Sequence, residues 1–332
     1  MSTPGQHDLS GIADLLRAAT DVTLLAHVRP DADALGSALA LGRALAQRGA
    51  AVRVSFAVPA RTPESLRGLD PGNLVVSAAD VPSVGPLLIC LDTPSPDRLG
   101  GLADRVERTR AAGGAVVVID HHASNLYYGT HHFVDVGAEA TAVLVLRVLD
   151  ELGVPLDEPI ARCLYAGLMT DTGGFRRATP ETHRLAARLL AAGVEPDRLA
   201  REVLDEHPFA WLPMLSRVLG TARLEPDAAQ GLGLVHVTVT AEVAATVRME
   251  EVEAVVDVVT ATREAEVAAV FKELAPDEWS VSLRAVGKID VSVAARGLGG
   301  GGHRLASGCT VSGTAEQVLE KIREALAGAP LL

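Results

Sequence analysis

Histidine and aspartate side chains follow several apolar runs of this sequence, at the points where those runs end. There are four such groups: His27 with Asp31 and Asp33; Asp92; Asp120 with His121 and His122; and Asp171. Three of them follow short apolar runs typical of buried strands, and the fourth follows a helical stretch. Imidazole and carboxylate groups gathered in this way can bind metal ions or transfer protons.

Each group also has a simpler interpretation when it is taken alone. Asp33 can cap the helix that follows it, and His27 can be an ordinary loop histidine. Asp92 and Asp171 can each begin a turn. The two adjacent histidines are harder to explain in this way, and four groups that converge favour one shared site.

The residue types also predict which metal such a site would prefer. Mixed imidazole and carboxylate ligands without a thiolate suit Mn²⁺ or a similar ion better than a structural zinc site. Five or more ligands indicate two ions. Two ions roughly 3.5–4 Å apart can activate a water molecule and stabilise the attacking and leaving oxygens at phosphorus. The predicted chemistry is therefore phosphoester hydrolysis.

A glycine-rich segment near the C-terminal end is the other candidate for substrate contact. Glycines at 299–302 precede His303 and Arg304. A glycine backbone can approach a phosphate or a base closely, and a neighbouring histidine or arginine can add a positive donor. A flexible turn is the alternative for this run. Arg284 is either a phosphate-binding cation or a surface arginine.

The elements that position these groups follow from the hydrophobic pattern. Up to about residue 120, β-branched runs alternate with amphipathic stretches, which predicts an α/β fold with a doubly wound, mostly parallel sheet. Strands are expected at 22–26, 51–56, 87–91 and 115–119, and helices at 34–48, 103–112, 140–152, 159–169 and 180–192, the last capped by Thr179. Parallel strands end at one edge of a sheet, where such folds bind ligands.

The rest of the chain predicts a smaller α+β domain. Strands are expected at 232–238 and 265–273, a hairpin at 279–285 with 289–295, and a closing helix at 315–326. Helices interrupted by prolines connect it to the first domain. The predicted boundaries are a catalytic domain at 1–195, a helical linker at 196–228 and a substrate-binding domain at 229–332.

Composition restricts the possible partners. A net charge of −12 and 3% aromatic residues argue against a long track for nucleic acid, although bound metal ions would still admit a short anionic substrate. The N-terminal residues lack the pattern of a leader and no apolar run is long enough for a membrane span, so a cytoplasmic location is expected. Cys90, Cys163 and Cys309 are expected to be buried, reduced thiols.

In this order the motifs resemble those of the DHH phosphoesterase superfamily, in particular its members with a C-terminal DHHA1 domain. The resemblance implies two Mn²⁺ ions. It assigns one ion to His27, Asp31, Asp92 and Asp171, and the other to Asp33, Asp92, His121 and Asp171. It further implies that His122 acts catalytically on the substrate, that Asp120 supports the site, and that the substrate is bound by Arg284, Gly301, Gly302 and His303.

Size and motif order look most like the nanoRNase/pAp-phosphatase (NrnA-type) group. The resemblance therefore implies hydrolysis of short oligoribonucleotides to mononucleotides and of 3′-phosphoadenosine 5′-phosphate (pAp) to AMP, by a possible homodimer. A cyclic di-AMP phosphodiesterase and a manganese inorganic pyrophosphatase are alternatives. The pyrophosphatase is less favoured because the chain has only Lys272, Lys288 and Lys321 and no cationic cluster. A non-catalytic nucleotide-binding regulator is the alternative from another class.

Overall fold

A computed structural model describes residues 8–332, and the chain divides into two compact units, Met1–Glu206 and His207–Leu332. The division falls inside the segment predicted as a linker. Residues 1–7, the start of the predicted first domain, lie outside the described residues. The two units are considered separately below.

The first unit is built on a five-stranded parallel sheet with the order β2-β1-β3-β4-β5. Its strands are β1 (Asp21–Leu25), β2 (Ala51–Ser55), β3 (Leu87–Leu91), β4 (Ala115–Asp120) and β5 (His131–Val134). Sequence patterns predicted the first four of these, and β5 was missed. The chain runs outward in opposite directions from β1 and from β3, which are neighbours. Such a reversal opens a crevice at the carboxyl ends of the two strands, where ligands bind in folds of this class.

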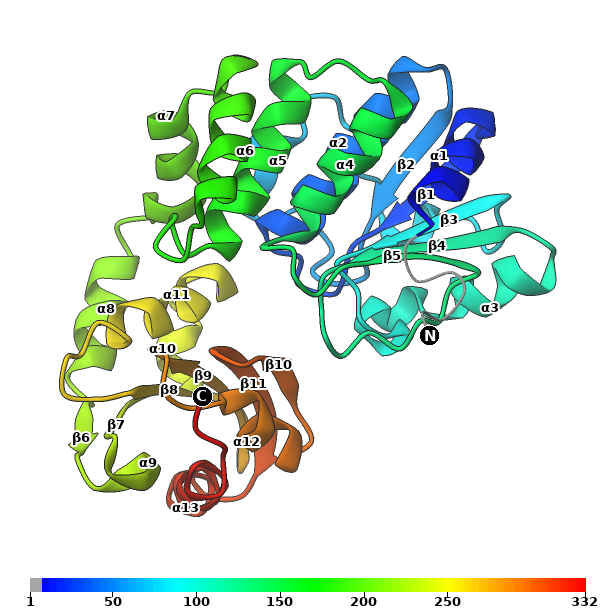
Figure 1. The fold of residues 1–332 in the computed structure, drawn as a ribbon. Helices are drawn as coiled ribbons and strands as arrows, with labels where there is room; N and C mark the ends of the chain where they lie inside the picture. Colours follow the sequence, from blue (N-terminus) through cyan, green and yellow to red (C-terminus); the bar gives the residue numbers. More distant parts are fainter. Residues whose placement is uncertain (1–7) are drawn as a thin grey trace. The chain divides into compact units, whose positions relative to one another are not determined.

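Helices cover both faces of this sheet (Figure 1). One face packs against α1 (Leu9–Ala18), α2 (Ala32–Gln47), α4 (Thr141–Leu152) and α5 (Glu158–Asp171). The other face packs against the 3₁₀ segment η3 (Pro96–Leu102) and α3 (Asp104–Ala111). The remaining segments are η1 (Glu64–Leu69), η2 (Ala78–Asp80), α6 (Pro180–Ala191), α7 (Pro196–Ala200) and the π-helical η4 (Arg201–Asp205). Thr179 caps α6, as predicted.

Two glycines allow α2 and α5 to pack very closely. A Cβ atom on Gly36 would lie 2.5 Å from the carbonyl oxygen of Cys163, and one on Gly167 would lie 2.9 Å from the Cα atom of Asp33. Only glycine fits such contacts with backbone atoms. The close packing places the start of α2, with its aspartates, beside the last turns of α5, which ends at Asp171.

The second unit contains a six-stranded mixed sheet with the order β10-β11-β9-β8-β7-β6. Its strands are β6 (Arg223–Glu225), β7 (Leu234–Val239), β8 (Val267–Ala275), β9 (Glu278–Ala285), β10 (Gly301–His303) and β11 (Ala306–Ser312). One face packs against α8 (Trp211–Leu219), α10 (Ala241–Ala244) and α11 (Met249–Val259), and the other against α9 (Ala228–Gly231), α12 (Val291–Gly297) and α13 (Ala315–Ala327). The predicted α/β and α+β fold classes are confirmed.

The predicted hairpin between residues 279–285 and 289–295 is wrong. β9 pairs with β8 and β11, and the second segment forms the helix α12. Asp290 starts this helix by accepting a hydrogen bond from the backbone N–H of Ser292 at 2.9 Å. The buried positions of α12 are Val291, Ser292, Ala294 and Ala295. This spacing is helical, whereas the alternation of valine with small residues over a few positions imitates a strand.

All three cysteines are buried, as predicted. Burial raises the pKa of the Cys90 and Cys163 thiols to about 12, so both stay protonated at neutral pH. Among residues 8–332, no helix has the length and apolarity needed to span a membrane.

Candidate active site

The predicted histidines and aspartates of the first unit meet at the carboxyl edge of its sheet. His27 follows β1 and Asp92 follows β3, so both lie at the reversal of the strand order. Asp92 has a left-handed backbone with φ of 54°, which is unusual for a residue with a side chain. Its N–H donates to the carbonyl of Ile119 at 3.0 Å and thereby connects the loop to β4. Strained backbone of this kind is often found at functional sites.

His27, Asp31 and Asp92 form the first cluster of possible metal ligands. The Nε2 atom of His27 lies 3.6 Å from Asp31 Oδ2 and 3.5 Å from Asp92 Oδ2. Its Nδ1 atom lies 2.9 Å from the carbonyl oxygen of Val28, a contact that needs a hydrogen on Nδ1. Metal-binding histidines commonly use one ring nitrogen in this way and leave the other for the metal. Asp31 also caps α2 by accepting from the N–H of Ala34.

Asp33, Asp92 and His121 form a second cluster, so the two clusters share Asp92. Nδ1 of His121 lies 3.2 Å from the carbonyl oxygen of Ala138. Nε2 of the same ring lies 3.5 Å from Asp92 Oδ1 and 3.3 Å from Asp171 Oδ2. The His121 ring is therefore oriented like the His27 ring of the first cluster, with Nδ1 on a carbonyl oxygen and Nε2 toward carboxylates.

Without a cation, this concentration of carboxylates is unfavourable. Burial and then the charges of Asp92 and Asp31 raise the pKa of Asp33 well above its ordinary value. Burial and then the neighbouring carboxylates, Asp33 first, raise the pKa of Asp171 in the same way. On His27, burial acts to lower the pKa, but Asp31 and Asp92 outweigh it and raise the value to about 10. Divalent cations would neutralise the carboxylates and displace the proton from His27, so the donor set fits metal ions.

Asp120 is fully buried and is surrounded by hydrogen-bond donors from the protein itself. Its Oδ1 accepts from the N–H of His121 at 2.9 Å and from Nδ1 of His122 at 2.7 Å, and its Oδ2 accepts from the Asn125 amide at 2.6 Å. On His122, burial acts to lower the pKa, but Asp120 outweighs it and the pKa is raised. Asp120 thus orients the His122 ring. Asn125 was missed in the sequence, although it lies only three residues after the second histidine.

The first turn of α4 also reaches the site, a contact that the sequence analysis did not predict beyond the start of a helix near residue 140. The Thr141 hydroxyl donates to Asp92, and the N–H groups of Thr141 and Ala142 donate to Asp33. Both acceptors belong to the second cluster. The structure therefore adds α4 to the elements that hold the site.

Within the second unit, the predicted substrate-binding residues lie on two strands, β10 and β9, which are separated by β11. Gly301, Gly302 and His303 form β10, and Arg284 lies near the end of β9. His303 is in register with Ala306 of β11, and Ala306 is in register with Arg284. His303 and Arg284 thus share one line across the three strands. Arg284 Nε lies 3.9 Å from Asp257 Oδ1, a long contact with an exposed carboxylate.

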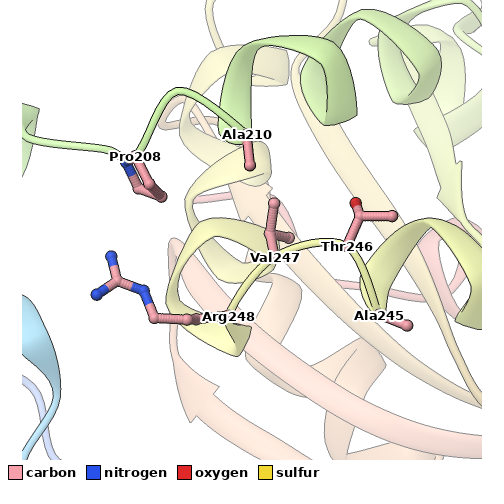
Figure 2. Close-up of a pocket in the computed structure, with 6 residues that line it drawn as sticks. All are labelled: Pro208, Ala210, Ala245, Thr246, Val247 and Arg248. Atoms are coloured by element: carbon pink, nitrogen blue, oxygen red, sulfur yellow. The ribbon is translucent and has the colours of Figure 1, made fainter.

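A pocket in the second unit is not part of this arrangement (Figure 2). Its lining is mostly small or apolar, and consists of Pro208, Ala210, Ala245, Thr246, Val247 and Arg248. None of these is a predicted site residue. This pocket therefore lies apart from the predicted substrate-binding residues of the second unit.

Comparison with known families identifies the class to which this fold and site belong. The DHH family, N-terminal domain, matches residues 21–168, and the DHHA1 domain matches residues 235–329. Together with a 35% identical relative that spans nearly the whole chain, these matches show that the chain belongs to the DHH family. It is a hydrolase of phosphoester bonds, from a family of metal-dependent phosphoesterases.

Individual relatives show which members of the family this chain is similar to. The chain is 35% identical over 331 residues to the bifunctional oligoribonuclease and PAP phosphatase NrnA of Thermus thermophilus, covering 97% of this chain and 95% of that protein. It is 26% identical to the protein of the same description from Bacillus subtilis, covering 87% and 89%. A crystal structure of an exopolyphosphatase-related protein from Bacteroides fragilis has the same fold, with a TM-score of 0.84, 24% identity and coverage of 96% and 95%.

Proposed function

We propose that this protein is a manganese-dependent phosphoesterase that hydrolyses short oligoribonucleotides to mononucleotides and pAp to AMP. The observation that supports this most directly is that the cluster of His27 and Asp31 and the cluster of Asp33 and His121 both include Asp92. The relatives from Thermus thermophilus and Bacillus subtilis, each described as an oligoribonuclease and PAP phosphatase, support the choice of substrates. That the protein forms a homodimer and is located in the cytoplasm are predictions from the sequence.

The proposed ligands divide into two sets that have two members in common. His27, Asp31, Asp92 and Asp171 would hold one Mn²⁺, and Asp33, Asp92, His121 and Asp171 would hold the other. When bound, the two ions would polarise the phosphoryl oxygens and lower the pKa of a water molecule between them. Asp92 and Asp171 would bridge the ions. Asp120 would orient the neighbouring histidines and would bind neither metal ion.

His122 is the proposed proton donor. Asp120 lies 2.7 Å from Nδ1 of the ring and raises the pKa of His122, which favours the protonated imidazole. The Nε2 atom then carries the proton that the leaving oxygen needs when the phosphoester bond breaks. Arg284 and His303 of the second unit, with the backbone of Gly301 and Gly302, would bind the part of the substrate that is not cleaved.

Two alternative substrates use the same metal chemistry. Pyrophosphate would require several cationic groups to neutralise it, yet Lys272, one of only three lysines, is buried and bonded to Glu253. Cyclic di-AMP needs no such cluster and therefore remains the stronger competitor. A non-catalytic regulator is disfavoured because both proposed bridging carboxylates are present.

The full-length protein should be incubated with pAp, pApA, longer RNA oligomers, cyclic di-AMP and pyrophosphate, with Mn²⁺ or with a chelator. We expect turnover of pAp and pApA that falls as the oligomer lengthens and stops when the metal is removed. Asp92→Asn should abolish turnover, whereas Asp21→Asn, on the opposite edge of the sheet, should not. Turnover of pyrophosphate alone, or activity unaffected by the chelator, would refute the proposal.

A further inference from the structure

We propose that Thr141 is a positioning residue that fixes the orientation of two proposed metal-binding carboxylates, Asp92 and Asp33. The inference deepens the proposed function and rests on it, because the metal ligands are assigned there. Neither the family resemblance nor the motifs include Thr141. Its side chain is fully buried, so its hydroxyl must find a partner inside the protein.

The Thr141 hydroxyl makes a short contact with Asp92. Its Oγ1 donates to Oδ1 of Asp92 at 2.8 Å, whereas the nearest nitrogens of His121 and His122 lie 3.5 Å from the same oxygen. A carboxylate oxygen that accepts one hydrogen bond keeps a second lone pair for a metal ion. The hydroxyl therefore selects the rotamer of Asp92 and the lone pair that is left for coordination. This matters because the backbone of Asp92 is itself strained.

The backbone of the same turn holds Asp33. The N–H of Thr141 donates to Oδ2 at 2.7 Å, and the N–H of Ala142 donates to Oδ1 at 2.8 Å. Both oxygens are thus bound at once, which fixes the plane of the carboxylate. Ala140, which precedes the helix, provides no side-chain cap, so Asp33 takes the place of a local cap for α4.

A single residue consequently couples two carboxylates that come from different parts of the fold. Asp92 follows β3 and Asp33 lies in the first turn of α2. Their separation is set by Thr141, whose hydroxyl reaches one while its N–H reaches the other. Groups that support metal ligands in this way typically change metal affinity by about 10- to 100-fold when they are removed.

Three substitutions test the hydroxyl. Thr141→Val removes it with little change of volume, Thr141→Ala removes it without adding a methyl group, and Thr141→Ser retains it. Thr109→Val, at a buried position of α3 in the same unit, is the matched control for loss of a buried hydroxyl. Mn²⁺ alone is titrated into each metal-free, full-length protein by calorimetry, and the melting temperature of the metal-free form is measured in parallel.

We expect Thr141→Val and Thr141→Ala to bind Mn²⁺ at least about tenfold more weakly than the wild type. Thr141→Ser and Thr109→Val should bind like the wild type. The metal-free melting temperatures of Thr141→Val and Thr109→Val should be similar, because the expected defect lies in ligand orientation. The proposal would be overturned if Thr141→Ser bound Mn²⁺ as weakly as Thr141→Val does. It would also be overturned if a folded variant without the hydroxyl bound Mn²⁺ with wild-type affinity.

The same titration separates this proposal from the proposed function. If the wild type binds no Mn²⁺, the assigned metal centre is wrong and the role of Thr141 fails with it. If the wild type binds Mn²⁺ and Thr141→Val binds it equally well, only the role of Thr141 fails.

Discussion

His121 and His122 are adjacent in the sequence, but their rings make different contacts. His121 places Nδ1 on a carbonyl oxygen and Nε2 near Asp92 and Asp171. His122 places Nδ1 on Asp120, and its ring is the proposed proton donor. Successive residues at the end of a strand point in opposite directions, so one motif can supply a metal ligand and a proton donor.

This difference predicts the effect of His122→Gln. Loss of a general acid should lower kcat for pAp by about 10²- to 10⁴-fold, while Mn²⁺ binding measured by calorimetry stays close to that of the wild type. The defect should shrink for an aryl phosphoester, whose leaving group needs no proton. An equal loss for both substrates would contradict the assignment of His122 as proton donor.

At the scale of elements, the glycine run around β10 contains positions with different requirements. A Cβ atom on Gly302, where φ is 135°, would lie 2.5 Å from the carbonyl oxygen of Ala306. A Cβ atom on Gly301 would meet no atom of the described residues within 4 Å. Packing within the fold therefore requires glycine at position 302 but does not explain the glycine at position 301. Close approach of a substrate would explain it.

We therefore predict that Gly302→Ala lowers the free energy of unfolding by more than about 1 kcal/mol. Gly301→Ala should change it by less than about 0.5 kcal/mol but should raise KM for pAp. Urea denaturation and steady-state kinetics measure the two effects. Gly297→Ala, at another open position in the same unit, is the control and should change neither quantity. A wild-type KM in Gly301→Ala would remove that residue from the proposed substrate contacts.

An ion pair connects the edge strand β6 to α13 within the second unit. Arg323 donates to both oxygens of Glu225, at 2.7 and 2.8 Å, and His236 lies 3.0 Å from the same carboxylate. These contacts, Arg323 first, lower the pKa of Glu225 below its ordinary value of 4.5. Its contribution to stability is therefore complete above the unfolded-state pKa and is lost as the pH falls through the folded-state pKa.

Glu225→Gln should accordingly lower the free energy of unfolding by about 1 kcal/mol at neutral pH. The difference from the wild type should diminish as the pH falls below about 4.5. Denaturation curves at several pH values provide the measurement. Glu320→Gln removes a more exposed partner of the same arginine and should have a smaller effect. A difference that grows on acidification would contradict this account.

At the scale of the whole molecule, the proposed metal ligands all belong to the first of two compact units. Metal binding should therefore stabilise the units unequally. At a free Mn²⁺ concentration about 100 times its Kd, we expect a gain of about 2.7 kcal/mol in the stability of the first unit. Amide hydrogen exchange should show greater protection in residues 8–206 and little change in residues 207–332.

Two controls make this prediction specific. A chelator should reverse the added protection, and Asp92→Asn should show none. Equal protection of both units would indicate that Mn²⁺ binds elsewhere or that the units do not respond independently.

The sequence by itself identified the α/β fold class and the residues gathered at the sheet edge. Both depend on short-range patterns: an apolar strand is followed at once by a polar group, and parallel strands end at one edge. The family likeness rests on the same motifs. The helix α12 was mistaken for a strand because alternation over a few residues does not distinguish the two.

Only the tertiary structure revealed the contacts of Thr141 and the reasons for the individual glycines. Thr141 lies 108 residues after Asp33 and 49 after Asp92, so no local pattern could connect them. The requirement for glycine at 36 and 302 likewise comes from backbone atoms far along the chain or on a neighbouring strand. Sequence motifs identify the side chains that can do chemistry, whereas tertiary packing determines which neighbouring residues hold those side chains in place.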